Sequence, residues 1–486
     1  MAITQNERLL SITTPLGEDH LLLDTFTARE GISELFRIEA HLLHEENDAG
    51  LVPHIVDPKS ILGQPVTIRV KTTDRTAREF SGIVSRFSQG NRDTRFTHSS
   101  ITIVPHVWLL TQKSQSRIFQ QKSVPDILRT VFTGFQTKFE LQGTFEPRNY
   151  CVQYRETDFD FASRLMEEEG IFYYFEHTDG KHTMVFANTP QSNVECRSKS
   201  TIPFSIHREG EEAFTGSIAT FSTRYQVQTG KVTLWDHNFQ LPTSNLSHEK
   251  PSRFSYGDNQ KLELYDYPGG YARKYDGIDK GGSEQASELQ KVFEDRSRSV
   301  DLLMEGLDSR TVVATASSDV CSITAGYRFT LSNHPVSDLN GAYVITSVQH
   351  SAGQNPGYET DAGGGYGNEF ECIRHSAGAP TFRPPLKTPK PVVQGGQTAL
   401  VVGPAGEEIF TDKYGRVKVQ FYWDREGQAN ESSSCWIRVA QIWAGKRWGT
   451  MFIPRIGMEV VVDFLEGDPD QPIITGCVYN PETMPP

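Results

Sequence analysis

The chain has 486 residues, of which 37% are hydrophobic, 10% aromatic and 22% charged. This composition is typical of folded globular domains and excludes a mainly disordered protein, and the length predicts about two to four domains. The formal net charge of −13 argues against nucleic acid as the main partner, because a phosphate backbone attracts basic surfaces.

Neither a secretory signal nor a membrane span is visible in the sequence. Residues Met1–Arg8 are polar, and the longest apolar runs are far shorter than the roughly 20 residues that cross a bilayer. The cysteines form no CxxC pair, so most are expected to be buried thiols of a protein made in a reducing cytosol. They are Cys151, Cys196, Cys321, Cys372, Cys435 and Cys477.

Residues 8–104 predict a first β-barrel or sandwich. Phe36–Leu42, Val66–Val70 and Ser100–Val104 alternate apolar and polar side chains, with the period of two that marks a half-buried strand. Turn-forming residues separate these runs.

A possible metal site within this region is His41 and His44, followed by Glu45 and Glu46. Positions three apart on a strand point to opposite faces, so the two histidines cannot share an ion without a bend. We therefore expect a solvated strand end.

Two helices are predicted next, each by its N-cap. Ser123 begins the first, with Asp126 at the capping-box position, and Gly134 ends it. Thr157 begins the second, which Gly170 ends.

The acidic run Glu167–Glu169 near the end of the second helix could be read as paired carboxylates for acid–base catalysis. Consecutive helical positions diverge by about 100°, so these side chains do not converge on one site. A solvated helix end is the better interpretation.

The following residues mix strand patterns with one more helix. Residues 171–187 predict a hairpin, and 205–300 combine weak strands with a helix from about Ser283 to Ser299. Strand patterns return between 311 and 373 and complete a second barrel. Residues 376–397, rich in Pro and Gly, have the composition of a linker.

The last part of the chain, residues 398–479, carries five or six short strand patterns and no helix pattern, which predicts a small closed barrel of the OB type. Its clearest strand is Arg416–Asp424, which alternates without interruption. The expected core face is Val417, Val419, Phe421 and Trp423, and the expected solvent face is Arg416, Lys418, Gln420, Tyr422 and Asp424.

An acidic cluster in this barrel resembles a calcium loop only loosely, because the Gly and the terminal Glu of such a loop do not fall in place. We interpret it as an acidic hairpin turn. The cluster comprises Asp463, Glu466, Asp468 and Asp470.

A barrel of this type could bind single-stranded nucleic acid or a saccharide. From Thr398 onward twelve Asp and Glu outnumber eight Lys and Arg, a poor match to a phosphate backbone. Trp436, Trp443 and Trp448 could offer stacking faces, but core packing and subunit contacts are the expected roles.

The sequence carries no recognisable catalytic motif. The sequence contains no G-x-S-x-G, H-E-x-x-H or P-loop pattern, and its fourteen histidines are scattered. We therefore predict no catalytic, cofactor-binding or metal-ligating residue. A hydrolase site within residues 190–310 stays open as an alternative, which a convergent acid–base cluster there would favour.

Several long segments resemble the VgrG family, the valine-glycine-repeat tip proteins of type VI secretion. They occur in the family's order over essentially the whole chain. The segments are Arg117–Gln120 with Val124–Leu128, Tyr154–Phe159 with Arg164–Gly170, Tyr265–Gly269, Thr411–Gln420, Ser434–Arg438, Ile453–Gly457 and Phe464–Pro472.

The resemblance implies a mainly β protein with helical insertions (β+α), with the body of a contractile-phage-tail hub followed by an OB-fold barrel. The family normally continues into a β-helical spike, so the chain is expected to be truncated before it. The implied parts are a hub at 1–376 with barrels at about 1–105 and 150–376, a linker at 377–397, an OB-fold neck at 398–480 and the start of the spike at 481–486.

The resemblance also implies a structural rather than enzymatic protein. It would be a homotrimer on the tube protein Hcp, in contact with baseplate components, and would carry a PAAR-repeat tip protein and effectors into target cells. No cofactor, no nucleic acid and no stable membrane insertion are expected. The protein would assemble in the bacterial cytoplasm and be secreted without a signal peptide.

Two other interpretations remain open at this point. One is the hub-spike protein of a phage or tailocin of closely similar build. The other comes from different functional classes: a cell-wall-acting hydrolase or an OB-type saccharide-binding protein.

Overall fold

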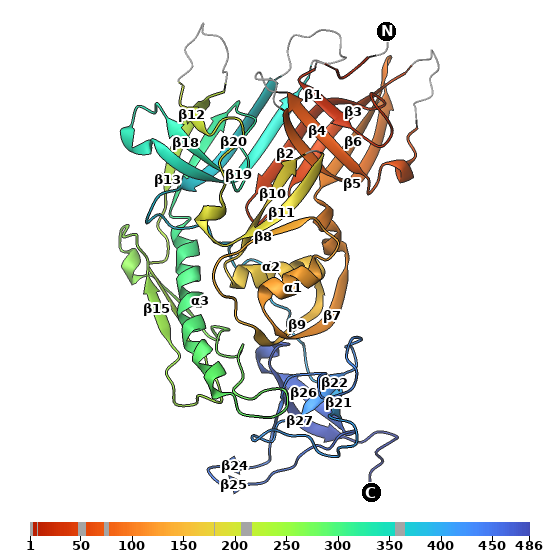
Figure 1. Ribbon diagram of the computed structural model, residues 1–486, viewed down its shortest axis with the longest axis vertical. Helices are drawn as coiled ribbons and strands as arrows, with labels where there is room; N and C mark the ends of the chain where they lie inside the picture. The colour runs from red at the N-terminus through yellow and green to blue at the C-terminus, as the bar shows by residue number, and fades with distance from the viewer. Residues whose placement is uncertain are drawn as a thin grey trace.

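The structure is a computed structural model that describes residues 3–6, 8–46, 55–71, 77–178, 180–205, 216–354 and 365–486. The molecule is elongated, with a broad β region at one end, helices in the middle and a small barrel at the other end (Figure 1). The N-terminal strands lie in the broad region and the C-terminus lies beside the small barrel (Figure 1).

One twelve-stranded sheet forms the broad region, in the order β1-β4-β5-β6-β3-β2-β19-β20-β17-β13, with β12 and β18 paired off this path. Strands from both predicted β regions meet in it, because β2 pairs antiparallel with β19. The strands are β1 (Leu10–Thr13), β2 (Leu22–Gly31), β3 (Arg37–Glu45), β4 (Pro65–Lys71), β5 (Ala77–Arg92), β6 (Phe96–Val104), β12 (Thr201–Pro203), β13 (Ile218–Tyr225), β17 (Val312–Ser318), β18 (Arg328–Ser332), β19 (Gly341–Gly353) and β20 (Gly365–Arg374).

Two separate hydrophobic cores lie along this sheet. The first is built around β1–β6 and extends to the helices of the middle region, and the second lies around β17–β20. Representative members are Phe26, Phe36 and Phe80 in the first core and Phe329 and Phe370 in the second. Burial of these rings supplies much of the stabilisation, at roughly 25 cal/mol per Å² of apolar surface.

The middle region holds two short helices, α1 (Val124–Val131) and α2 (Asp158–Glu168). Both predicted caps are confirmed: the hydroxyl of Ser123 accepts a hydrogen bond from the Asp126 amide, and that of Thr157 accepts one from the Asp160 amide. The adjoining strands are β7 (Ser114–Lys122), β8 (Thr137–Glu140), β9 (Arg148–Thr157), β10 (Phe172–Thr178) and β11 (Lys181–Ala187).

A third helix, α3 (Lys291–Asp308), runs along one side of the molecule (Figure 1). It begins and ends later than the predicted 283–299, because residues 286–290 form a 3-10 turn and its first position has no side-chain cap. The three-stranded sheet beside α3 comprises β14 (Lys231–Leu234), β15 (His248–Pro251) and β16 (Glu263–Asp266).

The C-terminal barrel is a five-stranded sheet in the order β22-β21-β26-β27-β23. A bridge between Val417 and Ile437 joins its first and last strands, which closes the sheet. Of the predicted core face, Val417, Val419 and Phe421 are each at most 1% exposed, whereas Trp423 is partly buried against the same core. The strands are β21 (Gln397–Val402), β22 (Lys418–Phe421), β23 (Arg438–Val439), β26 (Glu459–Phe464) and β27 (Pro472–Val478), with a separate hairpin of β24 (Ala444–Gly445) and β25 (Trp448–Gly449).

The described residues contain no helix that combines the length and apolarity needed to cross a membrane. All six cysteines are free thiols, and four of them, Cys151, Cys196, Cys372 and Cys435, are buried as the sequence predicts.

Candidate functional site: the joint between the body and the C-terminal barrel

The C-terminal barrel is fastened to the rest of the chain by a buried ionic contact, which we call the joint. The guanidinium of Arg416 donates to both carboxylate oxygens of Asp276, at 2.7 and 2.9 Å, and its Nε donates to Asp412 at 2.6 Å. Arg416 is only 3% exposed. Burial opposes the charge, but the two carboxylates outweigh it and raise the pKa of Arg416 above its usual range.

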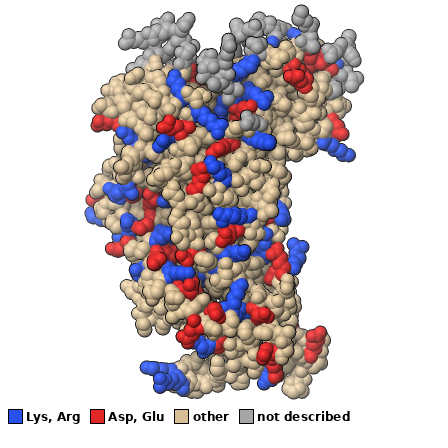
Figure 2. Space-filling view, viewed as in Figure 1, with Lys and Arg blue, Asp and Glu red and all other residues tan. Residues whose placement is uncertain are grey.

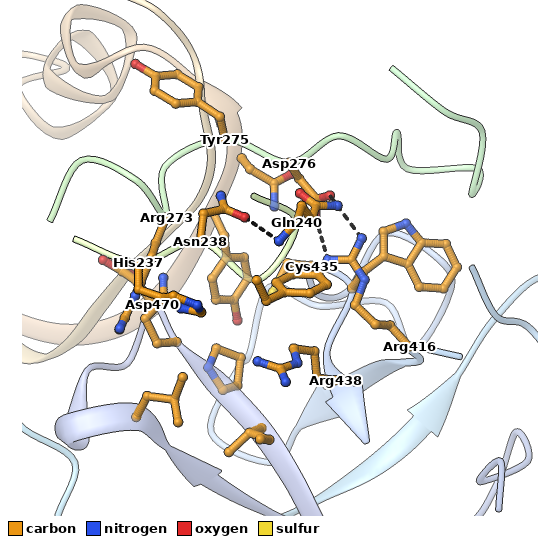
Figure 3. Close-up of a pocket in the computed structure, with 18 residues that line it drawn as sticks. His237, Asn238, Gln240, Arg273, Tyr275, Asp276, Arg416, Cys435, Arg438 and Asp470 are labelled. Atoms are coloured by element: carbon orange, nitrogen blue, oxygen red, sulfur yellow. Dashed lines mark hydrogen bonds and ion pairs between the residues drawn. The ribbon is translucent and has the colours of Figure 1, made fainter. Parts of the chain in front are cut away.

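The carboxylate of Asp276 is held in place from its own side of the joint. It accepts hydrogen bonds from the Gln240 side chain at 2.9 Å and from the Ile278 amide at 3.0 Å. Figure 3 shows Asp276 and Gln240 beside Arg416 in the lining of a cavity of about 110 Å³. Bidentate Arg–carboxylate geometry of this kind fixes orientation as well as distance.

The polar face of the Arg416–Asp424 strand is solvated only in part. Tyr422 is exposed as predicted, but Arg416, Lys418 and Asp424 are buried. The Trp436 indole donates to the Asp279 carbonyl at 2.7 Å, and the Lys418 ammonium lies 4.8 Å from the centre of the Trp436 ring. Burial lowers the pKa of Lys418 to about 8.

The predicted solvated end of helix α2 is also wrong. Glu167 and Glu169 are buried and Glu168 is partly buried. Acidic side chains at a helix C-terminus oppose the helix dipole, and basic side chains from distant segments offset this. Arg148 contacts Glu168 at 2.6 Å and Glu169 at 2.5 Å, and Arg298 contacts Glu169 at 2.5 Å.

The Pro- and Gly-rich stretch 376–397 carries specific contacts along its length. Arg383 pairs with Glu305 at 2.8 Å, and the Thr388 hydroxyl donates to Glu167 at 2.7 Å. Lys390 contacts both Asp468 and Asp470 at 2.9 Å. This stretch therefore links the end of α2 to the acidic turn of the barrel.

That acidic turn is engaged by the body rather than gathered around an ion. Besides contacting Lys390, Asp470 accepts a hydrogen bond from the Val152 amide on β9 at 2.6 Å. Within the described ranges no group of three or more His, Cys, Asp or Glu side chains could hold a metal ion. His44 instead contacts the His20 carbonyl at 2.8 Å.

The chemistry of the joint favours fastening over catalysis. Cys435 lines the cavity, but burial raises the pKa of its thiol to about 12, so the nucleophilic thiolate is not formed near neutral pH. Arg416 binds two carboxylates, and Asp276 binds Arg416 and Gln240. Arg438, which also lines the cavity, lies 4.8 Å from the centre of the Phe239 ring.

The hydrolase alternative required converging acid and base groups within 190–310. In the described part of that stretch, the buried carboxylates are engaged by basic side chains or backbone amides. Asp295 pairs with Lys274 at 2.9 Å and with Arg298 at 2.6 Å, and Asp236 accepts from the Ala272 amide at 3.0 Å. Lys274 and Arg298 also contact Glu169. Asp276 faces the joint cavity, whereas Asp236, Asp295 and Asp308 do not line it.

The sequence did not indicate the joint, because its members lie far apart along the chain. Asp276 and Arg416 are separated by 140 positions. The alternation of apolar and polar residues in the barrel strand was the only local pattern there, and it predicts that Arg416 faces solvent.

Two family models match the chain. The phage tail baseplate hub model covers residues 29–356, and the type VI secretion system/phage-baseplate injector OB-domain model covers residues 408–479. The mainly β fold with a phage-hub-like body and a C-terminal OB barrel is thereby confirmed.

Curated relatives from Pseudomonas aeruginosa match the whole chain. The type VI secretion system spike protein VgrG1b is 41% identical over 498 residues, covering 100% of this chain and 62% of the relative. VgrG1a is 41% identical over 493 residues, covering 99% and 71%, and VgrG1c is 40% identical over 497 residues, covering 100% and 63%. The chain thus spans about two thirds of these relatives, whose names describe spike proteins rather than enzymes.

Solved structures agree on the fold. The Escherichia coli c3393 protein, a type VI secretion component described as similar to the T4 bacteriophage tail proteins gp27 and gp5, superposes with a TM-score of 0.64 at 19% identity, over 96% of this chain and 99% of that one. A chain of a half-lidded Francisella PdpA–VgrG complex gives a TM-score of 0.57 at 9% identity, over 97% of this chain and 78% of that one. The hub model, the OB-domain model and the relatives that match the whole of this chain agree. The chain therefore belongs to the VgrG family of type VI secretion spike proteins.

Proposed function

We propose that this protein is a structural hub and spike-neck at the tip of a type VI secretion injector. The observation that carries the proposal is the match of the whole chain to curated VgrG spike proteins at 41% identity. The chain acts by assembly and mechanical transmission, and we assign it no catalytic residue, metal or cofactor.

We divide the chain into a hub at residues 1–376, a connecting stretch at 377–397 and an OB neck at 398–480. The two cores of the hub support its division into two barrel units. In this arrangement the buried Arg416–Asp276 contact fastens neck to hub, and a force along the long axis is passed between them without relying on a flexible linker.

The partners follow from this role. Three copies form the tip and stand on the hexameric Hcp tube, next to baseplate components, and a PAAR-repeat protein and effectors ride at the far end. Two similar barrel units per copy would let a threefold hub match a sixfold tube. The protein assembles in the bacterial cytoplasm and leaves the cell with the contracting machine, without a signal peptide and without stable insertion in a membrane.

The test is export of the tube protein. In a strain that keeps this gene and lacks its other spike genes, Hcp should appear in the culture medium. Deleting the gene should remove Hcp from the medium while leaving its level in the cells unchanged, and a plasmid copy should restore it. Undiminished export after deletion would overturn the proposal.

A further inference from the structure

One segment of the neck projects from the barrel as a separate hairpin, here called the arm and defined as residues 441–452. Its strands β24 and β25 pair only with each other, Ala444 with Gly449 and Gly445 with Trp448. The Gln441 side-chain oxygen accepts from the Phe452 amide at 2.8 Å, and the Gln441 side-chain nitrogen donates to the Phe452 carbonyl at 3.1 Å. The arm therefore has a defined shape and extends from the lower end of the molecule (Figure 1).

The arm exposes an unusual amount of apolar surface. The exposed fractions are 87% for Ile442, 63% for Trp443, 57% for Trp448, 61% for Met451 and 64% for Phe452. A two-stranded hairpin is barely stable alone in water, and contiguous exposed apolar residues mark contact surfaces. The arm is thus built to be covered by another surface.

The tip of the arm is basic. Lys446 and Arg447 lie between β24 and β25, both are exposed, and neither has an ion-pair partner among the described residues. Figure 2 shows basic side chains gathered at the end of this projection. A covering surface should therefore be apolar with acidic groups at one side.

A surface of that chemistry lies on the outer side of the same barrel, which we call the acidic face. Leu400 is paired with both Gln420 and Glu459, and Glu459 is paired with Val478. Residues directly opposite in a sheet share a face. Tyr422 follows the end of β22 in a turn, where it feels the charge of Glu459. The acidic face comprises Leu400, Tyr422, Glu459 and Val478, with Glu482 beside it.

The acidic face combines exposed apolar side chains with carboxylates. Tyr422 is 63% exposed and Val478 is 39% exposed. Partial burial together with the charges of Glu459 and Glu482 raises the pKa of Tyr422, which places both carboxylates near its ring. Apolar area and negative charge here match the apolar area and positive charge of the arm.

The arm does not cover the acidic face of its own chain. Strand β23, which leads into the arm, is the last strand of the sheet order, whereas β22, which leads to Tyr422, is the first. Figure 1 shows the arm and the C-terminal segment on opposite sides of the barrel, at a similar height along the long axis. A rotation about an axis parallel to the long axis keeps that height, so it brings the arm of one copy level with the acidic face of the next.

We propose that the arm of each copy docks on the acidic face of the neighbouring copy. Arm and face are different surfaces, so the contact is head-to-tail, and head-to-tail contacts close into a ring when the rotation permits. The inference deepens the proposed function, since it rests on the homotrimer and names the surface that closes it. Trp443 and Trp448, with ring centres 5.1 Å apart, are the aromatic anchors of the contact.

The test is a charge-swap series measured by sedimentation equilibrium on the full 486-residue chain. K446E/R447E makes the tip acidic, and E459K/E482K makes the face basic. Each places like charges together, which is costly at an interface, so each should weaken trimer formation by at least tenfold. The variant with all four changes restores opposite charges and should recover most of the association.

A matched control for K446E/R447E carries the same change in net charge elsewhere in the chain. Lys122 and Lys181 are exposed and lie outside the barrel, so K122E/K181E should associate like the unmodified chain. Circular dichroism and the urea midpoint check that every variant is folded.

Three outcomes would overturn the inference: trimers that persist in both two-site reversals, a fourfold variant no better than either reversal, or a chain that stays monomeric at all concentrations. The Hcp export assay is read independently of this series. A failure of the docking contact is therefore distinguishable from a failure of the injector-tip function.

Discussion

The joint buries charged side chains and pairs them within one chain, whereas the arm, some twenty-five residues beyond Arg416, exposes apolar side chains that its own chain leaves uncovered. At the joint, Arg416 is 3% exposed and bound to two carboxylates, while at the arm Trp443 is 63% exposed. The difference separates two tasks. The joint contributes to the stability of one chain, and the arm contributes to association between chains.

The largest loss of single-chain stability is expected at the joint. Asp276→Asn keeps the shape of the side chain but removes its charge, leaving buried Arg416 with Asp412 as its only carboxylate. Breaking a buried ion pair from one side costs about 3 kcal/mol or more. Urea unfolding should show this loss, whereas Asp258→Asn, at an exposed surface pair, should change stability by at most about 0.5 kcal/mol.

The joint can be tested further by replacing both partners. Since well-packed apolar residues often equal buried ion pairs, Asp276→Leu with Arg416→Met should be more stable than Asp276→Asn alone, provided that Asp412→Asn removes the carboxylate that would otherwise stay buried without Arg416. If this triple variant were worse than the single one, the hydrogen bonds of Asp276 to Gln240 and Ile278 would matter more than its charge.

The ionic cluster at the end of α2 predicts a dependence on pH. Burial alone would raise the pKa of Glu168, but Arg148, Lys390 and Lys274 lower it from 4.5 to about 2. Between pH 4.5 and 2 the unfolded chain carries a proton on Glu168 that the folded chain lacks. The stability that this carboxylate contributes is therefore fully present above pH 4.5 and is lost as the pH falls towards 2. The slope is about 1.4 kcal/mol per pH unit.

The pH dependence is checked with Glu168→Gln, which removes this one titration. Its stability deficit relative to the unmodified chain should be largest above pH 4.5 and should shrink in urea titrations at pH 4 and 3. Glu407→Gln, at an exposed position, is the matched control for the same change of side chain. A constant deficit for Glu168→Gln would contradict the assignment.

Sequence reasoning succeeded where the interactions are local. The caps at Ser123 and Thr157 act on amides three residues away, and the alternation Val417, Val419, Phe421 reports a core directly beneath its own strand. Such features can be predicted from the sequence because both partners lie within a few residues of each other along the chain. The starts of α1 and α2 were predictable for this reason, whereas α3, which has no side-chain cap, begins later than predicted.

It failed where the partner comes from a distant segment. Arg416 and Lys418 have the pattern of a solvent face, and Glu167–Glu169 the pattern of a solvated helix end. Arg416 is paired with Asp276, 140 positions away, and the helix end is contacted by Arg148 and Thr388, 21 and 221 positions away. A charged residue is expected at the surface unless it is paired, and the pairing is not visible in a single sequence.

A smaller effect than at the joint is expected from a purely local contact. Thr157→Ala removes the hydroxyl that accepts from the Asp160 amide at 3.0 Å. Loss of an N-cap costs about 1 kcal/mol, because one helix amide is left without a partner. Urea midpoints give the measurement, and Thr157→Ser, which keeps the hydroxyl, should lie close to the unmodified chain.

The smallest effect on single-chain stability is expected in the arm, and two tryptophans make the comparison direct. Trp443→Ala, at a 63% exposed position, should change the free energy of unfolding by about 0.5 kcal/mol or less at concentrations where the chain is monomeric. Trp436→Ala, seven positions earlier and 6% exposed, should cost about 3 kcal/mol because a cavity remains. The order should reverse when association between chains is measured. Trp443→Ala should then weaken association more than Trp436→Ala, because the arm loses an anchor whereas the joint is already formed within each chain. Equal losses in the monomer would mean that the arm packs on its own barrel, and the division between joint and arm would fail.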